Sequence, residues 1–191
     1  MEYFKYKNNF QPEKGSLLIS EPFLPDPNFE RTVVLLCEHN EEGSFGFVLN
    51  KPSTVLLDEI MEDVNDFSEK VYIGGPVQQD TLHFVHREEN IEGGVPIAEG
   101  LYWGGNFEQL LSMINTKQVS GNDFRFFVGY SGWSEGQLKN ELDADSWIVA
   151  NYANEQLVFN TPEDELWKVV LKELGGRFNV YSNYPTDPRL N

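Results

Sequence analysis

Five consecutive apolar residues, Val33 to Cys37, dominate the segment RTVVLLC at positions 31–37 and restrict the possible folds more than any other feature. Successive side chains of a β-strand point to opposite faces, so a strand that is apolar at every position is typically covered on both faces. The segment SFGFVLN at positions 44–50 follows after a polar turn that contains Gly43. The pattern predicts a β-hairpin whose first strand is buried on both sides.

Further segments have the composition of strands, and four have the pattern of helices. The other strand candidates are 16–20, 71–73, 81–86, 96–102, 124–130, 146–151 and 156–159. The predicted helices are Thr54–Asp66 after Ser53, a helix capped by Asn106, a helix opened by Ser134 and Gln137, and a helix that begins at Thr161 and Pro162 and ends at Gly175. Each start offers a side chain that can accept a backbone N–H of the first turn.

The order of these elements predicts the fold class. Pairs and triplets of strands separate the helices, so we expect an α+β fold with a mixed, largely antiparallel β-sheet and about four flanking helices. The 191 residues are enough for one domain with its own core. Because no linker rich in Pro, Gly or Ser divides the chain, we expect a flexible leader over residues 1–14 and a single domain over residues 15–191.

The chain is strongly acidic. Its 14 basic and 31 acidic residues give a formal net charge of −17, and the lysines and arginines are scattered without a run. Binding of nucleic acid or of an anionic membrane needs clustered cations, so we expect neither partner. A single cysteine excludes an intramolecular disulfide, the N-terminus lacks an apolar signal sequence, and no apolar stretch is long enough to span a bilayer. These features predict a cytoplasmic protein.

The sequence GYSGW at positions 129–133 raises the question of serine catalysis, because it follows a predicted strand and precedes a predicted helix. A nucleophile elbow has the pattern G-x-S-x-G, whereas here Trp133 stands at the position of the second glycine. No histidine follows Ser131 in the chain. We therefore interpret the segment as a turn that glycine permits, with Trp133 packed beneath it.

Reactive side chains concentrate in the segment Cys37-Glu38-His39-Asn40. On an extended strand Cys37 and His39 share a face, and a histidine beside a thiol can promote the nucleophilic and oxidisable thiolate. The alternative is that Cys37 is a buried, small apolar side chain. Both interpretations remain open from the sequence.

Neither a cofactor nor a metal is expected. The glycine pairs at 74–75 and 104–105 match neither G-x-G-x-x-G nor the P-loop pattern. His83 and His86 have a spacing that suits a helix, whereas their segment is a predicted strand. Cys37 and His39 could supply two metal ligands, which is fewer than a stable zinc site needs.

The segment LPDPNFER, which ends at Arg31, is polar, and two prolines hold its backbone around Asp26. One interpretation is an Asp26–Arg31 pair that pins this loop, and the other is one wall of a ligand groove. On the second interpretation the hairpin brings the polar segments at the ends of its two strands, CEHN at 37–40 and LNKP at 49–52, close together. The candidate ligand or partner site then comprises Asp26, Arg31, Cys37, His39 and Asn50, and no catalytic residue is assigned.

Several motifs occur in the order found in one known family. The segments GSLLIS, DPNFERTVVLLCEHNEEGSFGFVLNKP, YIGGPVQQD, GYSGWSEGQLKNEL, SWIVA and FNTPEDELWKVVLKELGG resemble the YqgE/AlgH family from about Gly15 to Gly176. Carried over by position, the family pattern falls on Asp26, Pro27, Phe29, Arg31, Cys37, Glu38, His39, Asn50, Gly74, Gly75, Pro76, Gly129, Gly132, Trp133, Gly136, Gln137 and Leu138. The chain departs mildly from it at Thr32 and Ser131, where serine and alanine are common.

The resemblance implies a compact α+β fold in which the sheet curls over on itself, in a bacterial protein of a kind often labelled a transcriptional regulator. We expect a cytoplasmic binding or regulatory module that acts through a protein or small-molecule partner, without direct DNA binding. The alternative is a redox-active or hydrolytic enzyme centred on Cys37 and His39. Slow reaction of the Cys37 thiol with an alkylating probe would favour the first hypothesis.

Overall fold

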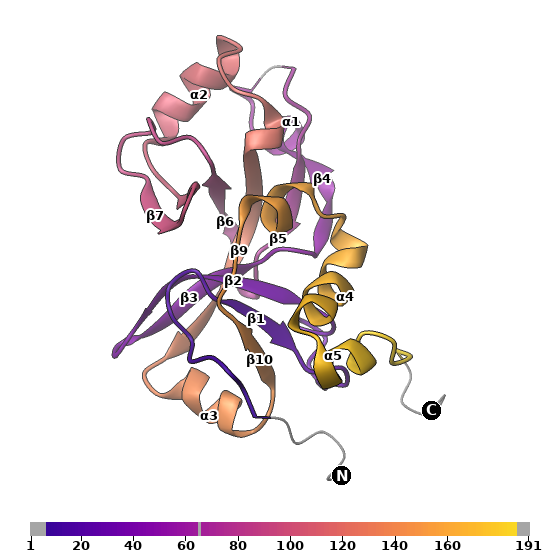
Figure 1. Cartoon of the computed structure of the whole chain (residues 1–191). Coiled ribbons are helices and arrows are strands. Elements are labelled where there is room, and N and C mark those ends of the chain that lie inside the picture. The colour runs from indigo at the N-terminus through magenta and orange to yellow at the C-terminus, as the bar shows by residue number, and fades with distance from the viewer. Residues whose placement is uncertain (1–6, 65, 187–191) are drawn as a thin grey trace.

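The computed structural model describes residues 7–64 and 66–186 (Figure 1). The strands are β1 (Leu17–Ser20), β2 (Val33–Asn40), β3 (Gly43–Val48), β4 (Pro52–Leu56), β5 (Lys70–Ile73), β6 (Val77–His86), β7 (Val95–Ala98), β8 (Leu101–Trp103), β9 (Phe124–Ser134) and β10 (Trp147–Ala150). The α-helices are α1 (Leu57–Ile60), α2 (Phe107–Asn115), α3 (Gln137–Asp143), α4 (Glu163–Leu174) and α5 (Gly176–Tyr181).

The strands form one ten-stranded sheet in the order β10-β1-β2-β3-β9-β6-β8-β7, with β5 beside β9 and β4 beside β5. Among the described strands, only the pair β5 and β9 is parallel. The long strand β9 connects two parts of the sheet, because its last residues pair with β3 while its first residues pair with β5 and β6. The predicted α+β single domain with a largely antiparallel sheet is confirmed, and the sheet is not closed into a barrel.

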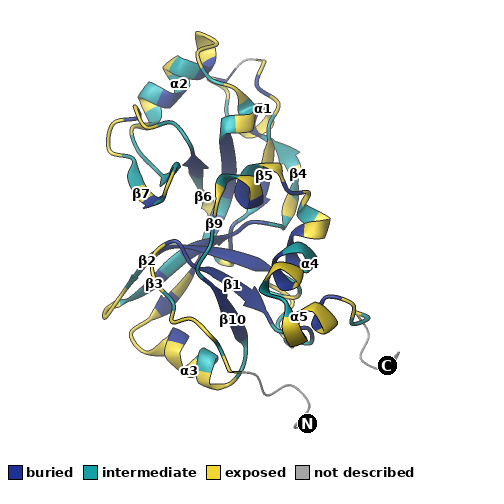
Figure 2. Cartoon of the chain, viewed as in Figure 1, coloured by how far each residue is buried: buried dark blue, intermediate teal, exposed yellow. Residues whose placement is uncertain are grey.

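Strand β2 is covered on both faces, as its unbroken apolar run predicts. Val33, Leu35 and Cys37 lie in the cluster of buried residues beneath α4 and α5, which also contains Leu166, Trp167, Val170, Leu171, Phe178 and Tyr181. Val34 and Leu36 point to the opposite face and join the cluster beneath α3, with Leu138, Trp133 and Trp147. The centre of this part of the sheet is accordingly buried (Figure 2).

The predicted helix over Thr54–Asp66 is wrong for most of its length. Residues 52–56 form strand β4, which pairs with β5, and among the described residues of the predicted helix only Leu57–Ile60 is helical. The apolar periodicity of this segment is helical, but pairing with a distant strand supplies backbone hydrogen bonds that local propensity does not foresee. The predicted strand 156–159 is also wrong, because Gln156–Asn160 is a turn of π-helix.

The three other predicted helices begin close to the expected residues. The side chain of Asn106 accepts a hydrogen bond from the backbone N–H of Gln109 at 3.0 Å, as expected for an N-cap. Helix α4 starts directly after Pro162 and stops at Gly175, whose φ of 68° is one that glycine adopts without strain. Helix α3 starts at Gln137, and the backbone N–H of Ser134 donates to the Gln137 side chain at 3.0 Å.

Part of the predicted leader contacts the edge strand β10. The side chain of Asn8 donates to the carbonyl oxygen of Trp147 at 3.0 Å and accepts the N–H of Val149 at 2.9 Å. These two bonds occupy backbone groups that β10 would otherwise expose at the sheet edge. Residues 1–6 of that segment lie outside the described part of the chain. Within the described part, none of the helices combines the length and the apolar character that crossing a membrane requires.

Candidate functional site

The five residues proposed from the sequence do not converge in the structure. In the hairpin of β2 and β3, His39 lies opposite Ser44, while Val34 lies opposite Val48. Asn50 therefore lies near the start of β2 and His39 near its end. The prediction that the polar ends at His39 and Asn50 meet is wrong, because in an antiparallel hairpin the end of the second strand lies beside the start of the first.

Asn50 and Arg31 are in contact, and the contact organises the backbone. The amide nitrogen of Asn50 donates to the carbonyl oxygen of Arg31 at 2.9 Å, and its oxygen accepts the N–H of Val33 at 2.9 Å. Arg31 has a φ of 48°, a left-handed conformation that is unfavourable for a residue with a side chain. The two bonds hold this conformation where the chain enters β2.

The guanidinium group of Arg31 faces the C-terminal part of the chain. It donates to the carbonyl oxygen of Tyr184 at 2.6 Å and lies 4.7 Å from the ring centre of Trp167. Burial lowers the pKa of Arg31, although the neighbouring Glu30 raises it. Asp26 is not its partner, because the Asp26 side chain accepts the N–H of Asn28 at 2.9 Å in a turn of its own loop. The predicted Asp26–Arg31 pair is thus absent: Asp26 bonds within its own loop, and Arg31 bonds to the C-terminal part of the chain.

Cys37 is fully buried in the cluster beneath α4 and α5. The pairing of β2 with β3 shifts register between Leu36 and Glu38, and Cys37 is the residue at this bulge. Burial raises the pKa of the Cys37 thiol well above its usual value, and the Glu38 carboxylate raises it further. His39 is half-buried, and its Nδ1 lies 2.7 Å from the hydroxyl of Ser44. This environment opposes formation of a thiolate and explains Cys37 as an apolar core residue.

Ser131 also has a structural partner. Its side chain is fully buried and donates to the carbonyl oxygen of Gly74 at 3.0 Å. The GYSGW segment lies within β9, so the interpretation as a turn is wrong, whereas Trp133 is buried as expected. The strand continues to Ser134 because residues 131–134 pair with β3.

A small pocket beside this end of β9 brings together residues that are distant in the sequence. It has a volume of about 250 Å³ and lies between the 24–29 loop, the β5–β6 turn, the end of β9, helix α3 and the start of β10. Its lining residues are Leu24, Asp26, Phe29, Pro76, Gly132, Trp133, Gln137, Glu141, Ser146 and Trp147. Of the five residues proposed from the sequence, this pocket includes Asp26.

Three aromatic side chains, Phe29, Trp133 and Trp147, line this pocket. The ring of Phe29 lies 6.4 Å from that of Trp133 in a stacked arrangement and 5.3 Å from that of Trp147 in an edge-on arrangement. The two tryptophan rings are 5.9 Å apart and nearly perpendicular. These distances and angles are those that aromatic quadrupoles favour, so the rings hold one another in place.

The carboxylate of Glu141 lines the pocket beside the two tryptophans. Its Oε2 accepts the indole N–H of Trp133 at 2.8 Å and that of Trp147 at 2.7 Å, while its Oε1 accepts the Gln137 amide at 3.0 Å. A carboxylate has about four acceptor positions, so Oε1 can accept one more bond. Together with Asp26, Glu141 makes the pocket anionic, and its lining contains no lysine or arginine.

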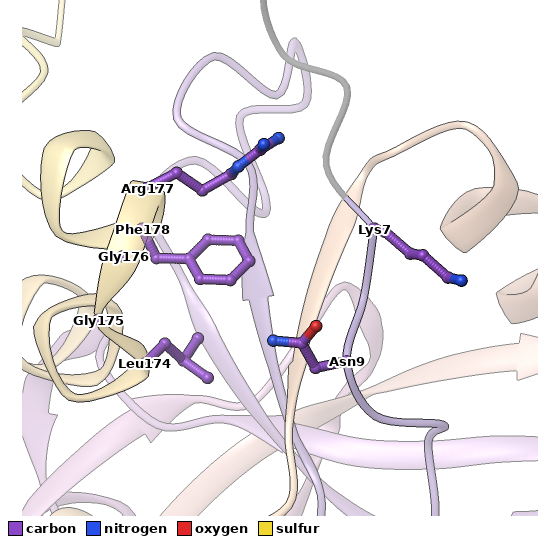
Figure 3. Close-up of a pocket in the computed structure, with 7 residues that line it drawn as sticks. All are labelled: Lys7, Asn9, Leu174, Gly175, Gly176, Arg177 and Phe178. Carbon is purple, nitrogen blue, oxygen red and sulfur yellow. The ribbon is translucent and has the colours of Figure 1, made fainter.

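Other hollows offer less specific chemistry. One of about 590 Å³ lies between the N-terminal segment and the corner from α4 to α5 (Figure 3). Leu174 and Phe178 point from that corner toward Asn9, whereas Lys7 points away from the hollow. Within residues 7–64 and 66–186, no three His, Cys, Asp or Glu side chains gather closely enough to hold a metal ion.

Sequence reasoning missed two important members of the pocket, Glu141 and Trp147. Glu141 follows Gln137 by four positions on a helix that the sequence does predict, and residues with this spacing lie on one helical face. That spacing could have placed Glu141 beside Gln137. Nothing local connects Trp147 with either residue, because only the packing of β10 beneath α3 brings it there.

Comparison with known proteins places the chain in a family. The model of a family described as AlgH-like matches residues 17–179. The chain belongs to the AlgH-like family. Among the relatives of this AlgH-like protein, a UPF0301 protein of Cytophaga hutchinsonii is 47% identical over 180 residues, which cover 93% of this chain and 98% of the relative. A UPF0301 protein of Bacteroides thetaiotaomicron is 38% identical over 185 residues, covering 96% and 94%.

Two solved structures share the AlgH-like fold. The solution structure of the AlgH protein from Pseudomonas aeruginosa has a TM-score of 0.72 and 27% identity, covering 94% of this chain and 98% of that one. A crystal structure of a protein from Corynebacterium diphtheriae has a TM-score of 0.75 and 24% identity, covering 94% and 95%. The names of these relatives and neighbours state no ligand or reaction.

Proposed function

We propose that this AlgH-like domain is a binding module that holds a cationic group of a ligand or partner protein in the pocket beside α3. The observation that supports this most directly is the lining of the pocket, which combines three aromatic rings with the carboxylates of Asp26 and Glu141. Six of its ten lining residues also stand at positions of the YqgE/AlgH pattern: Asp26, Phe29, Pro76, Gly132, Trp133 and Gln137.

The chemistry of the lining selects for positive charge. Of the three aromatic rings only that of Phe29 is partly exposed, and an ammonium or guanidinium group near an aromatic face gains about 0.5–2 kcal/mol from the ring quadrupole. Asp26 is a half-buried residue of the lining, and a carboxylate there attracts a cation through a medium less polar than water. Glu141 is already oriented by the two indole groups, so it does not need to be reorganised when a ligand arrives.

The size of the pocket restricts the ligand to a small group. A volume of about 250 Å³ is below the roughly 300–1,000 Å³ typical of sites for whole small molecules. It suits a single amine or an arginine or lysine side chain that projects from a partner. A regulatory role of the protein would then be exerted through such a partner and not through DNA, since a formal net charge of −17 opposes binding to phosphates.

Titration with acetyl-arginine amide and acetyl-citrulline amide, followed by tryptophan fluorescence and by NMR of the indole N–H signals, tests this proposal. The two compounds have nearly the same shape, and only the first is charged. We expect saturable changes at Trp133 and Trp147 with the arginine compound, a lysine compound or both. Citrulline binding as tightly as arginine would contradict a cation site.

A matched pair of variants localises the effect. Asp26→Asn removes the charge while its side-chain oxygen can still accept the N–H of Asn28, so the loop is expected to keep its conformation. Glu41→Gln makes the same change of charge at an exposed position in the β2–β3 turn. Asp26→Asn should weaken binding and Glu41→Gln should not; equal effects would reduce the interaction to nonspecific attraction by an acidic protein.

A further inference from the structure

A second concave surface lies at the other end of the molecule, between helices α1 and α2 and across β6 and β9. Its volume is about 420 Å³, and its apolar lining consists of Ile60, Met61, Leu82, Phe107 and Val128. We call this surface the α1–α2 groove. Figure 1 shows α1 and α2 together at the upper end, away from α3, beside which the pocket described above lies.

The floor of the groove is more exposed than ordinary core. Ile60 has 43% of its surface exposed, and Met61, Leu82, Phe107 and Val128 are only partly buried. Partly buried apolar side chains that line one concavity are typical of a surface that another molecule covers. The volume lies within the range of about 300–1,000 Å³ found for binding sites.

The charged side chains that line the groove, or that neighbour its lining residues on α1 and α2, are acidic. Of the elements that line it, α1 with the following residues to Val64, β6 and α2 contain no lysine or arginine, while β9 contains Arg125, which is buried and donates to the carbonyl oxygen of Leu49. Asp80 lines the groove itself, and Glu59, Glu62, Asp63 and Glu108 are exposed close to its lining residues in the sequence. His83 in β6 adds no positive charge at neutral pH, because burial lowers its pKa.

We propose that the α1–α2 groove binds a basic amphipathic segment of a partner protein. Apolar side chains from one face of that segment would occupy the groove, and its lysines or arginines would lie against the acidic rim. This is the arrangement in which an amphipathic helix lies in a hydrophobic groove. Opposite charge at the rim adds specificity and speeds association.

The same charges argue against other occupants. An acidic segment or an anionic membrane would place like charges against Asp80 and its neighbours. A second copy of this chain would also be repelled, since each copy has a formal net charge of −17. A small apolar ligand would contact the apolar lining of the groove but would make no use of the acidic residues around it.

The test uses the whole protein and three peptides of about four helical turns each. The first is an amphipathic lysine–leucine helix, the second has the same composition in scrambled order, and the third replaces lysine by glutamate. Methyl NMR signals report where each peptide binds, and the change in chemical shift with concentration gives its Kd. We expect the amphipathic basic peptide to shift the methyl signals of Ile60, Met61, Leu82 and Val128.

Two variants that each replace an exposed aliphatic side chain by serine separate binding in the groove from general attraction. Ile60→Ser alters the groove, whereas Val180→Ser alters the exposed side chain of α5, which is 56% exposed. Both positions are at the surface, so both variants are expected to fold. Ile60→Ser should raise the Kd of the amphipathic basic peptide by about tenfold, and Val180→Ser should leave it unchanged.

Three results would overturn the proposal. They are equal affinity for the scrambled or the glutamate peptide, equal effects of Ile60→Ser and Val180→Ser, and shifts confined to the region of α3. Tight binding of the amphipathic basic peptide at the groove, with loss of affinity when Ile60 or Asp80 is replaced, supports it.

Discussion

The indole N–H of Trp133 donates to Oε2 of Glu141 at 2.8 Å, across the turn that leads from β9 to α3. Trp147, at the start of β10, donates to the same oxygen at 2.7 Å. The two tryptophans are 5% and 1% exposed, so neither indole can exchange this partner for bulk water. One helical carboxylate therefore joins the ends of two strands and forms a wall of the candidate site.

Replacing Glu141 should reveal how much its two hydrogen bonds with the indole groups contribute to stability. Glu141→Ala leaves two buried N–H groups without an acceptor, each of which costs about 1–3 kcal/mol, so we expect a loss of about 2–5 kcal/mol in the free energy of unfolding. Glu141→Gln retains an oxygen that can accept and should cost clearly less. Urea unfolding followed by fluorescence measures both values. Equal losses in the two variants would show that the hydrogen bonds are not the cause.

The Cys37 thiol should be inert in the folded protein. Its complete burial and its raised pKa leave little accessible thiolate at neutral or mildly alkaline pH. A disulfide reagent that releases a coloured thiolate should react slowly with the native protein and rapidly in urea. Rapid reaction of the native protein would revive the hypothesis of a redox-active or hydrolytic enzyme centred on Cys37 and His39.

The residues of the GYSGW segment should differ strongly in their effects on stability. Trp133→Ala removes a buried aromatic side chain and should cost about 3–5 kcal/mol. Ser131→Ala should cost only about 1 kcal/mol, because the carbonyl oxygen of Gly74 still accepts the N–H of Val48 at 2.8 Å. Thermal and chemical unfolding of the two variants give the ranking. The reverse order would indicate that Ser131 has a role beyond packing.

The stability of the fold should depend on pH through His86. This side chain is fully buried, its Nε2–H donates to the carbonyl oxygen of Gly104 at 2.9 Å, and its ring stacks with those of Tyr102 and Phe124. Burial lowers the pKa of His86, an effect that the Gly104 bond partly opposes. The unfolded chain therefore takes up a proton below about pH 6.5 while the folded protein does not, so stability falls as pH falls through this range.

A comparison with His86→Phe isolates this effect, because the other titrating groups are common to both proteins. The free energy of unfolding of the natural protein minus that of the variant should decrease between about pH 7 and the lowered pKa, by at most about 1.4 kcal/mol per pH unit. A difference that is constant or that grows toward low pH would contradict a buried neutral imidazole.

Direct and specific binding to DNA should be absent. The formal net charge is −17, and the lysines and arginines are scattered along the chain. Mobility shifts with fragments of genomic DNA at moderate salt provide the measurement. A saturable and sequence-selective shift at sub-micromolar protein would overturn the prediction.

Several features of the fold could be predicted because they depend on neighbouring residues. The run from Val33 to Cys37 indicates burial on both faces by itself, since the side-chain period of a strand is two. The Asn106 cap and the stop at Gly175 rest on contacts within one helical turn. The segment at 52–56 could not be assigned in this way, because its strand depends on β5.

The sequence alone determined the fold class, the family resemblance, the excess of negative charge and the apolar strand that requires a layer on each side. Tertiary structure decided which polar residues meet. It separated His39 from Asn50 through the direction of the hairpin, and it brought Asp26 into one pocket with Glu141 and Trp147, which lie far from it in the sequence. The physical reason is that patterns along a chain record local hydrogen bonding and burial, whereas a pocket depends on the pairing and packing of elements far apart in sequence.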